Sequence, residues 1–132
     1  MAVLLDTHAW MWSILDSRRL SAPIRNLLGA AGPVLVSVVS IYEVAHKARL
    51  GKWPEVAPKV DRLNEEAHAQ GVRLVDVDGR VALKAAQFDW MHRDPFDRLI
   101  AATAILRSAT LISADKQFDD LNALPAWPGR LW

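Results

Sequence analysis

The chain has 132 residues, of which 52% are hydrophobic, and its formal net charge is +1. This composition fits one globular domain spanning residues 1–132 and excludes both a disordered protein and one that attracts nucleic acid by a global positive charge. The absence of cysteine excludes a disulfide scaffold, a thiolate zinc site and a cysteine nucleophile. The lack of cysteine suits a reducing cytoplasm. We expect no signal peptide, because the start of the chain has no basic stretch followed by a long apolar run, and no membrane span, because no apolar run approaches roughly 18 residues.

Short apolar runs alternate with helical patterns, which predicts an α/β fold around a central, mostly parallel sheet of four or five strands. The first half predicts a strand at 2–5, a helix at 7–15, a helix that Ser21 caps and that ends near Gly29, a strand at 34–36, and a helix from Ser37 or Ser40 to Leu50. The second half predicts a helix at 58–70, a strand at 72–75, a helix at 79–91, a helix that Asp94 caps and that ends near Ser108, a strand at 110–113, a short acidic helix or turn at 114–121, and a candidate fifth strand in the tail at 125–132.

Two acidic residues directly follow predicted strands: Asp6 follows the first strand, and Asp115 follows the strand at 110–113. In an open parallel sheet, ligands bind beyond the carboxyl ends of the strands, near the point where the strand order reverses. Both carboxylates therefore face one crevice if their strands are neighbours. Each residue also fits a simpler role as the cap of the following helix, and the sequence leaves this alternative open.

Glu43 lies in the predicted helix that follows the second strand. Its mostly apolar surroundings make it a candidate for the same crevice. Two simpler interpretations stay open. Ser40 and Glu43 match a capping box, in which the glutamate reaches back to the amide of the cap residue. Glu43 and Lys47 also have the spacing of an ion pair along a helix.

Asp94 and Asp97 lie three residues apart at the start of a predicted helix, which places them on one side of its first turn. We interpret Asp94 mainly as the helix cap. Asp97 is the better candidate for the crevice, because the strand after its helix leads to Asp115. The alternative for both is stabilisation of the helix start by negative charge.

Carboxylates from four separated segments thus have a common crevice available to them. Crowded carboxylates repel and raise one another's pKa, and a hard cation relieves this repulsion. Carboxylate and water oxygens favour Mg²⁺ or Mn²⁺ over zinc. The sequence therefore predicts a divalent-metal site.

Four segments form a specific pattern: LLDTHAWMW, SVVSIYEVAHKARLGK, DPFDRLIAATA and LISADKQF. In this order and at this spacing, the chain resembles PIN-domain proteins, and specifically the VapC-like toxins of bacterial toxin–antitoxin pairs. The resemblance implies a three-layer α/β/α fold, endoribonuclease activity with one or two Mg²⁺ or Mn²⁺ ions, a homodimer and a VapB-like antitoxin. The family's metal-binding acids correspond to Asp6, Glu43, Asp97 and Asp115. Related chains often have an acidic residue at the position of Asp94 as well.

The implied reaction is hydrolysis of an RNA phosphodiester bond by a water molecule that the ion activates, with no side-chain nucleophile. Thr7 and Ser113 are candidates to hydrogen-bond a carboxylate or a phosphate, although each also fits the end of a helix or strand. For His8 we favour a buried or capping position over contact with RNA. The four histidines have no paired spacing, which argues against zinc.

Basic side chains near these segments are candidates to bind RNA phosphates: Lys47, Arg49, Lys52 and Arg98. The first three also suit a helix C-terminus, where cations are favourable, and Arg98 also suits a pair with a neighbour.

The chain contains six tryptophans. Trp10 and Trp12 lie two apart in a predicted helix, so they cannot face the same way. Together with Ile14, Leu50 and Trp53 they are candidates for the apolar groove that the family resemblance implies for an antitoxin helix. Stacking of RNA bases on tryptophan and simple core burial are the alternatives.

Three other functions compete with this interpretation. The first is a non-catalytic module of the same fold that binds RNA or a partner, and the second is a DNA-directed nuclease of the same superfamily. The third is a phosphoryl-transfer hydrolase with Asp6 as nucleophile, which leaves Glu43 unexplained. A nucleotide-binding Rossmann domain is disfavoured, because neither its glycine pattern nor a P-loop occurs.

Overall fold

The computed structural model describes residues 1–30 and 32–132. Its centre is a parallel sheet with the strand order β3-β2-β1-β4-β5. The strands are β1 (Val3–Leu5), β2 (Val34–Ser37), β3 (Arg73–Val75), β4 (Thr110–Ile112) and β5 (Arg130–Leu131). The predicted α/β class, the parallel sheet and the fifth strand in the tail are therefore confirmed.

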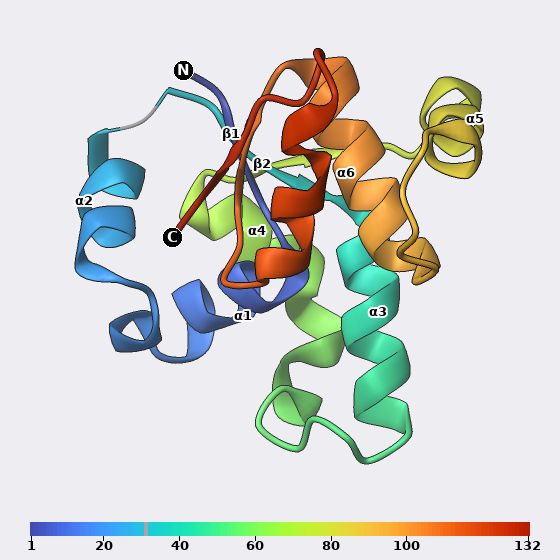
Figure 1. Ribbon diagram of the computed structural model, residues 1–132. Helices are drawn as coiled ribbons and strands as arrows, with labels where there is room; N and C mark the ends of the chain where they lie inside the picture. The colour runs from blue at the N-terminus through green and yellow to red at the C-terminus, as the bar shows by residue number, and fades with distance from the viewer. Residues whose placement is uncertain (31) are drawn as a thin grey trace.

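Helices connect the strands (Figure 1). The α-helices are α1 (Thr7–Leu15), α2 (Ala22–Ala30), α3 (Val38–Arg49), α4 (Leu63–Gln70), α5 (Gly79–Gln87) and α6 (Pro95–Arg107). The 3₁₀ segments are η1 (Ser17–Arg19), η2 (Ala57–Arg62) and η3 (Lys116–Ala123). In the described part of the chain, no helix has the length and apolar character needed to cross a membrane.

Alternate residues of each strand face opposite sides of the sheet, and both sides are covered by buried side chains. Val3 and Leu5 belong to one core cluster, which includes Trp10 of α1. Leu4 belongs to a second cluster, which includes Ile100 of α6. The helix α5 packs against α6 on the outside of the molecule (Figure 1). This arrangement gives the three layers that the family resemblance implies.

The strand order reverses between β1 and β4. From β1 the chain continues to β2 and β3 on one side, and it later adds β4 and β5 on the other side. The carboxyl ends of β1 and β4 lie together, because the amide of Asp6 donates a hydrogen bond to the carbonyl of Ile112 at 3.0 Å. The sheet therefore opens a crevice where sequence places Asp6 and Asp115.

Two helix boundaries differ from the prediction. The helix expected at 58–70 is the 3₁₀ segment η2 followed by α4, and it ends at Gly71, whose φ of 74° suits glycine. The helix expected at 79–91 ends at Gln87. After Gln87, the Arg98 guanidinium donates hydrogen bonds to the carbonyls of Phe88, Trp90 and His92 at 2.7 to 2.9 Å. These carbonyls accept from arginine and not from the backbone amides that would continue the helix.

Candidate active site

Asp6 combines the two roles that the sequence left open. Its Oδ1 accepts a hydrogen bond from the amide of Ala9 at 2.8 Å and thereby caps α1. The side chain also lines a cavity at the carboxyl edge of the sheet. Burial raises the pKa of Asp6, while hydrogen bonds from Ser113 and from the Ala9 amide partly offset this increase. The Asp6 carboxylate is therefore held in a position where its negative charge is poorly solvated. A bound cation would stabilise that charge.

Glu43 is held by side chains on both of its oxygens. The Thr7 hydroxyl donates to Oε1 at 2.7 Å, and Lys47 Nζ lies 2.7 Å from Oε2. The predicted ion pair with Lys47 is thus present. The alternative of a capping box is excluded, because Ser37 caps α3 and the Ser40 hydroxyl instead lies 2.8 Å from that of Thr7. Thr7 therefore supports a carboxylate, as one of its two interpretations proposed.

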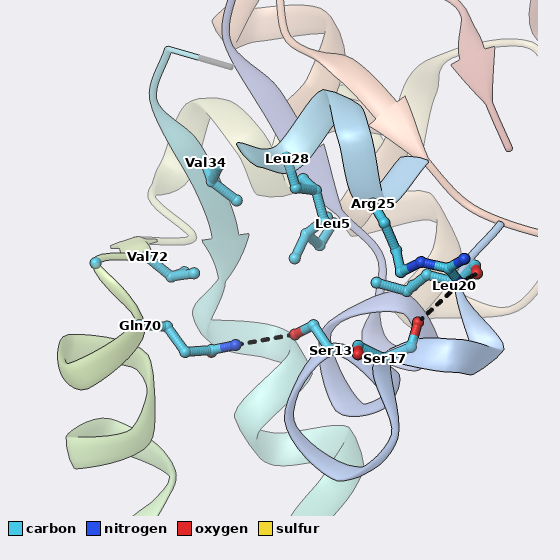
Figure 2. Close-up of a pocket in the computed structure, with 10 residues that line it drawn as sticks. Leu5, Ser13, Ser17, Leu20, Arg25, Leu28, Val34, Gln70 and Val72 are labelled. Atoms are coloured by element: carbon cyan, nitrogen blue, oxygen red, sulfur yellow. Dashed lines mark hydrogen bonds between the residues drawn. The ribbon is translucent and has the colours of Figure 1, made fainter. Parts of the chain in front are cut away.

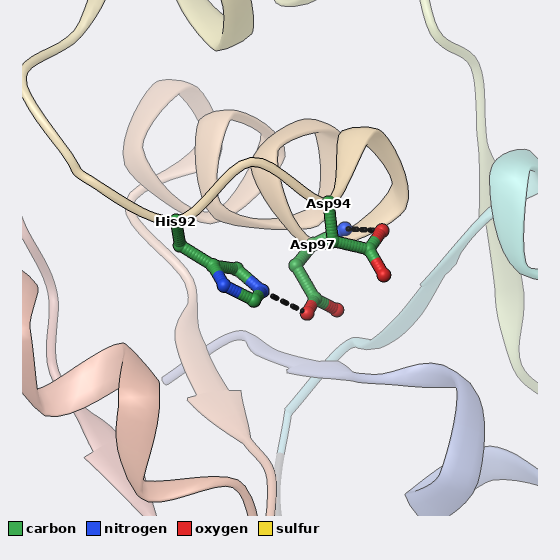
Figure 3. Close-up of side chains that lie close together, drawn as sticks. All are labelled: His92, Asp94 and Asp97. Atoms are coloured by element: carbon green, nitrogen blue, oxygen red, sulfur yellow. Dashed lines mark hydrogen bonds and ion pairs between the residues drawn. The ribbon is translucent and has the colours of Figure 1, made fainter.

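Asp94 and Asp97 lie at the start of α6, and His92 lies next to them (Figure 3). Asp94 caps the helix by accepting from the amides of Phe96 and Asp97 at 2.8 and 3.3 Å. His92 Nε2 lies 2.6 Å from Asp97 Oδ2. Burial, and to a smaller extent the charges of Asp94 and Glu43, raise the pKa of Asp97 to about 6, despite the hydrogen bond from His92. One ligand atom from each of His92, Asp94 and Asp97 fits within 4.8 Å.

Asp115 also serves as a cap, since it accepts from the amide of Gln117 at 2.9 Å at the start of η3. Its own amide donates to the hydroxyl of Ser113 at 3.0 Å. Ser113 is fully buried and also bonds the Asp6 carboxylate, so it connects the two acids that follow β1 and β4.

One cavity of about 290 Å³ joins these groups. Its lining residues include all four predicted acids, which are Asp6, Glu43, Asp97 and Asp115, together with Asp94, Thr7, His8, Lys47, His92 and Gln117. The structure therefore brings together carboxylates from the residue after β1, from α3, from α6 and from the loop after β4. Within the described lining, Lys47 is the one lysine or arginine, so the carboxylates outnumber the permanent cations.

This donor set fits a hard divalent cation. Carboxylate oxygens with room for water and phosphate oxygens are the ligands that Mg²⁺ and Mn²⁺ take in proteins. The raised pKa values of Asp6 and Asp97 show that these charges lack compensation from the protein alone. Asp6, Glu43, Asp97 and Asp115 line the cavity in which such an ion would lie, and the ligand atoms found there within 4.8 Å of one another are those of His92, Asp94 and Asp97.

A model of the PIN domain family matches residues 3–124 of the chain. The chain belongs to the PIN domain family. It is 31% identical over 116 residues to Ribonuclease VapC22 of Mycobacterium tuberculosis (strain ATCC 25618 / H37Rv), which covers 87% of this chain and 88% of that protein. The recognised resemblance to VapC-like PIN domains is therefore confirmed.

Solved structures share the fold of this PIN domain. The crystal structure of VapBC2 from Rickettsia felis, bound to a DNA fragment from their promoter, matches with a TM-score of 0.64 and 15% identity over 100% of this chain and 99% of that chain. A toxin-antitoxin complex from Klebsiella pneumoniae matches with a TM-score of 0.62 and 16% identity over 98% and 96% of the two chains.

Of the four basic residues predicted to bind RNA in this PIN domain, only Lys47 lines the acidic cavity. Lys52 lines a neighbouring cleft, and exposed Arg49 lies 3.4 Å from His46 Nδ1. The expectation for Arg98 needs correction. Its guanidinium donates four hydrogen bonds to backbone carbonyls between Ala85 and His92 and stacks 4.6 Å from the Phe88 ring, so its donors are already used.

The prediction of an apolar groove for a partner helix needs correction at Trp10. Trp10 is fully buried, and its Nε1 donates to Gln70 at 3.0 Å, so it belongs to the core. Gln70 in turn donates to Ser13 in a cavity of about 360 Å³ between α1, α2 and α4 (Figure 2). Among the described residues that line this cavity there is no carboxylate, so its lining differs in charge from that of the acidic site. Among the other groove residues, Trp12 is half-buried, Leu50 is exposed and Trp53 is buried.

Two histidines of the site differ from the sequence interpretation. His8 is exposed and lies at the edge of the acidic cavity, so the buried or capping position that we favoured is wrong. His92 was not predicted at all. The sequence feature nearest to His92 is the Asp-Pro pair two residues later, which marks the start of α6. That pair does not indicate where the preceding loop places the imidazole of His92.

Replacing the hydroxyl that supports Glu43 tests this arrangement. We expect Thr7→Val to weaken Mn²⁺ binding about tenfold, because outer hydrogen-bond partners orient ligand carboxylates. The measurement is calorimetric titration at neutral pH. Thr103→Val is the matched control, since Thr103 is also buried but its hydroxyl donates to the Leu99 carbonyl within α6. Equal Mn²⁺ affinity of Thr7→Val and Thr103→Val would contradict the role given to Thr7.

Proposed function

We propose that this PIN domain is an endoribonuclease that hydrolyses RNA phosphodiester bonds and depends on Mg²⁺ or Mn²⁺ held by Asp6, Glu43, Asp97 and Asp115. The convergence of these four carboxylates in one cavity is the observation that supports the proposal most strongly. The related protein VapC22 carries the name ribonuclease, which agrees with this activity.

When bound, one or two such ions supply an activated water and neutralise charge on the phosphate. The protein contributes fixed positions. The Ala9 amide and Ser113 hold Asp6, and Thr7 holds Glu43. His92 holds Asp97 from the loop that Arg98 organises. Asp115 acts as a fourth ligand or orients a water molecule. No side chain needs to act as the nucleophile.

We further propose that the chain is the toxin of a type II toxin–antitoxin pair, acts in the cytoplasm and is bound by a VapB-like antitoxin. The solved structures that share its fold support this assignment, since one is titled a toxin-antitoxin complex and another VapBC2. Assembly as a homodimer rests on the family resemblance, and size measurement of the purified chain tests it.

Cleavage of total RNA by the purified chain tests the proposed function. We expect cleavage with Mg²⁺ or Mn²⁺, loss of cleavage with a chelator, and recovery when either ion is added in excess. A chain that binds RNA but cleaves none with either ion is a non-catalytic module. Preferential cleavage of DNA identifies a DNA-directed nuclease, and a phosphorylated Asp6 identifies a phosphoryl-transfer enzyme. Each of these three results contradicts the proposal.

A further inference from the structure

A second cleft lies beside the acidic cavity and shares His8 and Lys47 with it. Its volume is about 350 Å³. The remaining lining residues come from α1, η1 and the turn after α3, and they are Trp12, Arg19, Lys52, Trp53 and Glu55. Because the two hollows share lining residues, they lie next to each other, within reach of neighbouring nucleotides of one strand.

Aromatic rings form one wall of the cleft. The exposed ring of His8 stacks on Trp53, with ring centroids 4.9 Å apart and an interplanar angle of 28°. Trp12 lies next to it, with its ring centroid 5.7 Å from that of His8. Trp53 is buried and supports the stack from below, so the imidazole of His8 is the ring surface offered to a ligand.

Positive charge forms the other part of the cleft. Three cations, Arg19, Lys47 and Lys52, and one carboxylate, Glu55, line the cleft, and Lys47 is also paired at 2.7 Å with Glu43 of the acidic cavity. Arg19 lies 4.9 Å from the Trp12 ring centroid, and its 3.7 Å ion pair with Glu55 contributes little because both side chains are largely exposed. Lys52 is exposed and has no ion pair within residues 1–30 and 32–132. Lysine and arginine side chains thus outnumber carboxylates in the lining of this cleft, whereas carboxylates outnumber them in the acidic cavity beside it.

We propose that this cleft binds the nucleotide next to the cleaved phosphate of a single-stranded RNA, with its base stacked on His8 and its phosphate paired with Lys52 and Arg19. The inference rests on the proposed ribonuclease function and adds a substrate subsite to it. Aromatic rings beside cations are the combination that binds unpaired nucleotides. A base inside a duplex cannot reach such a ring, so the cleft selects single strands. The excess of cations and the position next to the acidic cavity favour RNA over a peptide as the occupant.

Binding measured without cleavage tests the subsite. In an Asp6→Asn background with Mg²⁺ present, fluorescence anisotropy compares a short labelled oligouridylate with an abasic strand of equal phosphate count. We expect His8→Ala to weaken oligouridylate binding about tenfold, as loss of one base stack does, and His8→Phe to restore most of it. The abasic strand is expected to bind His8→Ala and its parent equally.

Substitution of the phosphate-binding lysine gives an independent readout. We expect Lys52→Ala to weaken both strands and to lower the slope of log affinity against log salt by about 0.7, because one phosphate contact is lost. Lys84→Ala on α5 is the control for general loss of positive charge, since it lines neither hollow, and we expect it to leave the oligouridylate affinity unchanged.

These measurements separate failure of the subsite from failure of the enzyme. Wild-type cleavage of RNA, combined with unchanged oligouridylate affinity in His8→Ala and an unchanged salt slope in Lys52→Ala, leaves the ribonuclease intact and overturns the subsite. Equal affinity for duplex and single-stranded RNA also overturns it. If the variants bind RNA normally but no longer retain a co-purified protein, the cleft is a protein-docking surface and the proposal is wrong. A wild type that cleaves no RNA overturns the proposed function whatever the variants bind.

Discussion

Asp6→Asn is expected to lower RNA cleavage by about a hundred- to thousandfold, the size of effect that follows loss of one strong electrostatic group from a catalytic site. The amide oxygen of asparagine can still accept from the Ala9 amide, so the cap of α1 remains. Because burial raises the pKa of Asp6, its charge opposes folding at neutral pH in the absence of metal. The metal-free variant should therefore melt at a higher temperature than the wild type while losing activity.

The matched control for this change is Asp78→Asn. Asp78 caps α5 by accepting from the Val81 amide at 3.0 Å, and it lies outside the acidic cavity. Its replacement should leave cleavage unchanged. Full activity of Asp6→Asn, or equal loss in both variants, contradicts the role assigned to Asp6.

Metal-free protein is expected to lose stability as the pH rises from about 4 to above 6. The carboxyl of Asp97 titrates near 3.8 in the unfolded chain and at about 6 in the folded protein, so in this interval the folded state binds more protons than the unfolded state. Stability then falls with rising pH, and it reaches a plateau above the folded pKa. After allowance for the 24% exposure of the Asp97 side chain, we expect its contribution to the fall to be about 2 kcal/mol.

Mg²⁺ should reverse this trend. Deprotonated carboxylates bind the ion, so the increase in melting temperature that it produces should be larger at pH above 7 than near pH 5. The measurement is thermal unfolding across pH with and without Mg²⁺. Asp97→Asn supplies the control, because it should remove the share of the metal-free pH dependence that comes from Asp97, while the share of Asp6, whose pKa is also raised, remains. A metal-free protein whose stability rises steadily from pH 4 to pH 7, with the same slope in Asp97→Asn, contradicts this prediction.

The location of the site could be predicted because it depends on local sequence patterns. Apolar runs that end in an acid place Asp6 and Asp115 at the carboxyl ends of strands, and parallel strands bring those ends to one edge. The structure adds that β1 and β4 are neighbours, which no single segment specifies. Asp6 and Asp115 also illustrate that capping and lining a cavity are compatible, since both residues do both.

The sequence alone could not predict the core position of Trp10 or the position of His92 in the site, because both depend on contacts between separate segments. Helical periodicity separates Trp10 from Trp12, but only the packing of α1 on the sheet and against Gln70 selects Trp10 for the core. The position of His92 depends on Arg98, which gathers the carbonyls of the preceding loop around its guanidinium. The sequence around an arginine in the first turn of a helix does not show whether the side chain binds backbone carbonyls, as Arg98 does, or the phosphates of a ligand.

Calorimetric titration of Mn²⁺ at neutral pH tests the central claim most directly. It compares wild-type protein with four single variants, Asp6→Asn, Glu43→Gln, Asp97→Asn and Asp115→Asn. We predict saturable binding by the wild type, and at least about tenfold weaker binding in each of the first three variants, because residues distant in sequence form one site. Asp115→Asn should weaken binding as much if Asp115 is a ligand, and less if it orients water. A wild type that binds no Mn²⁺, or Asp6, Glu43 and Asp97 variants that bind it as well as the wild type does, would contradict the account.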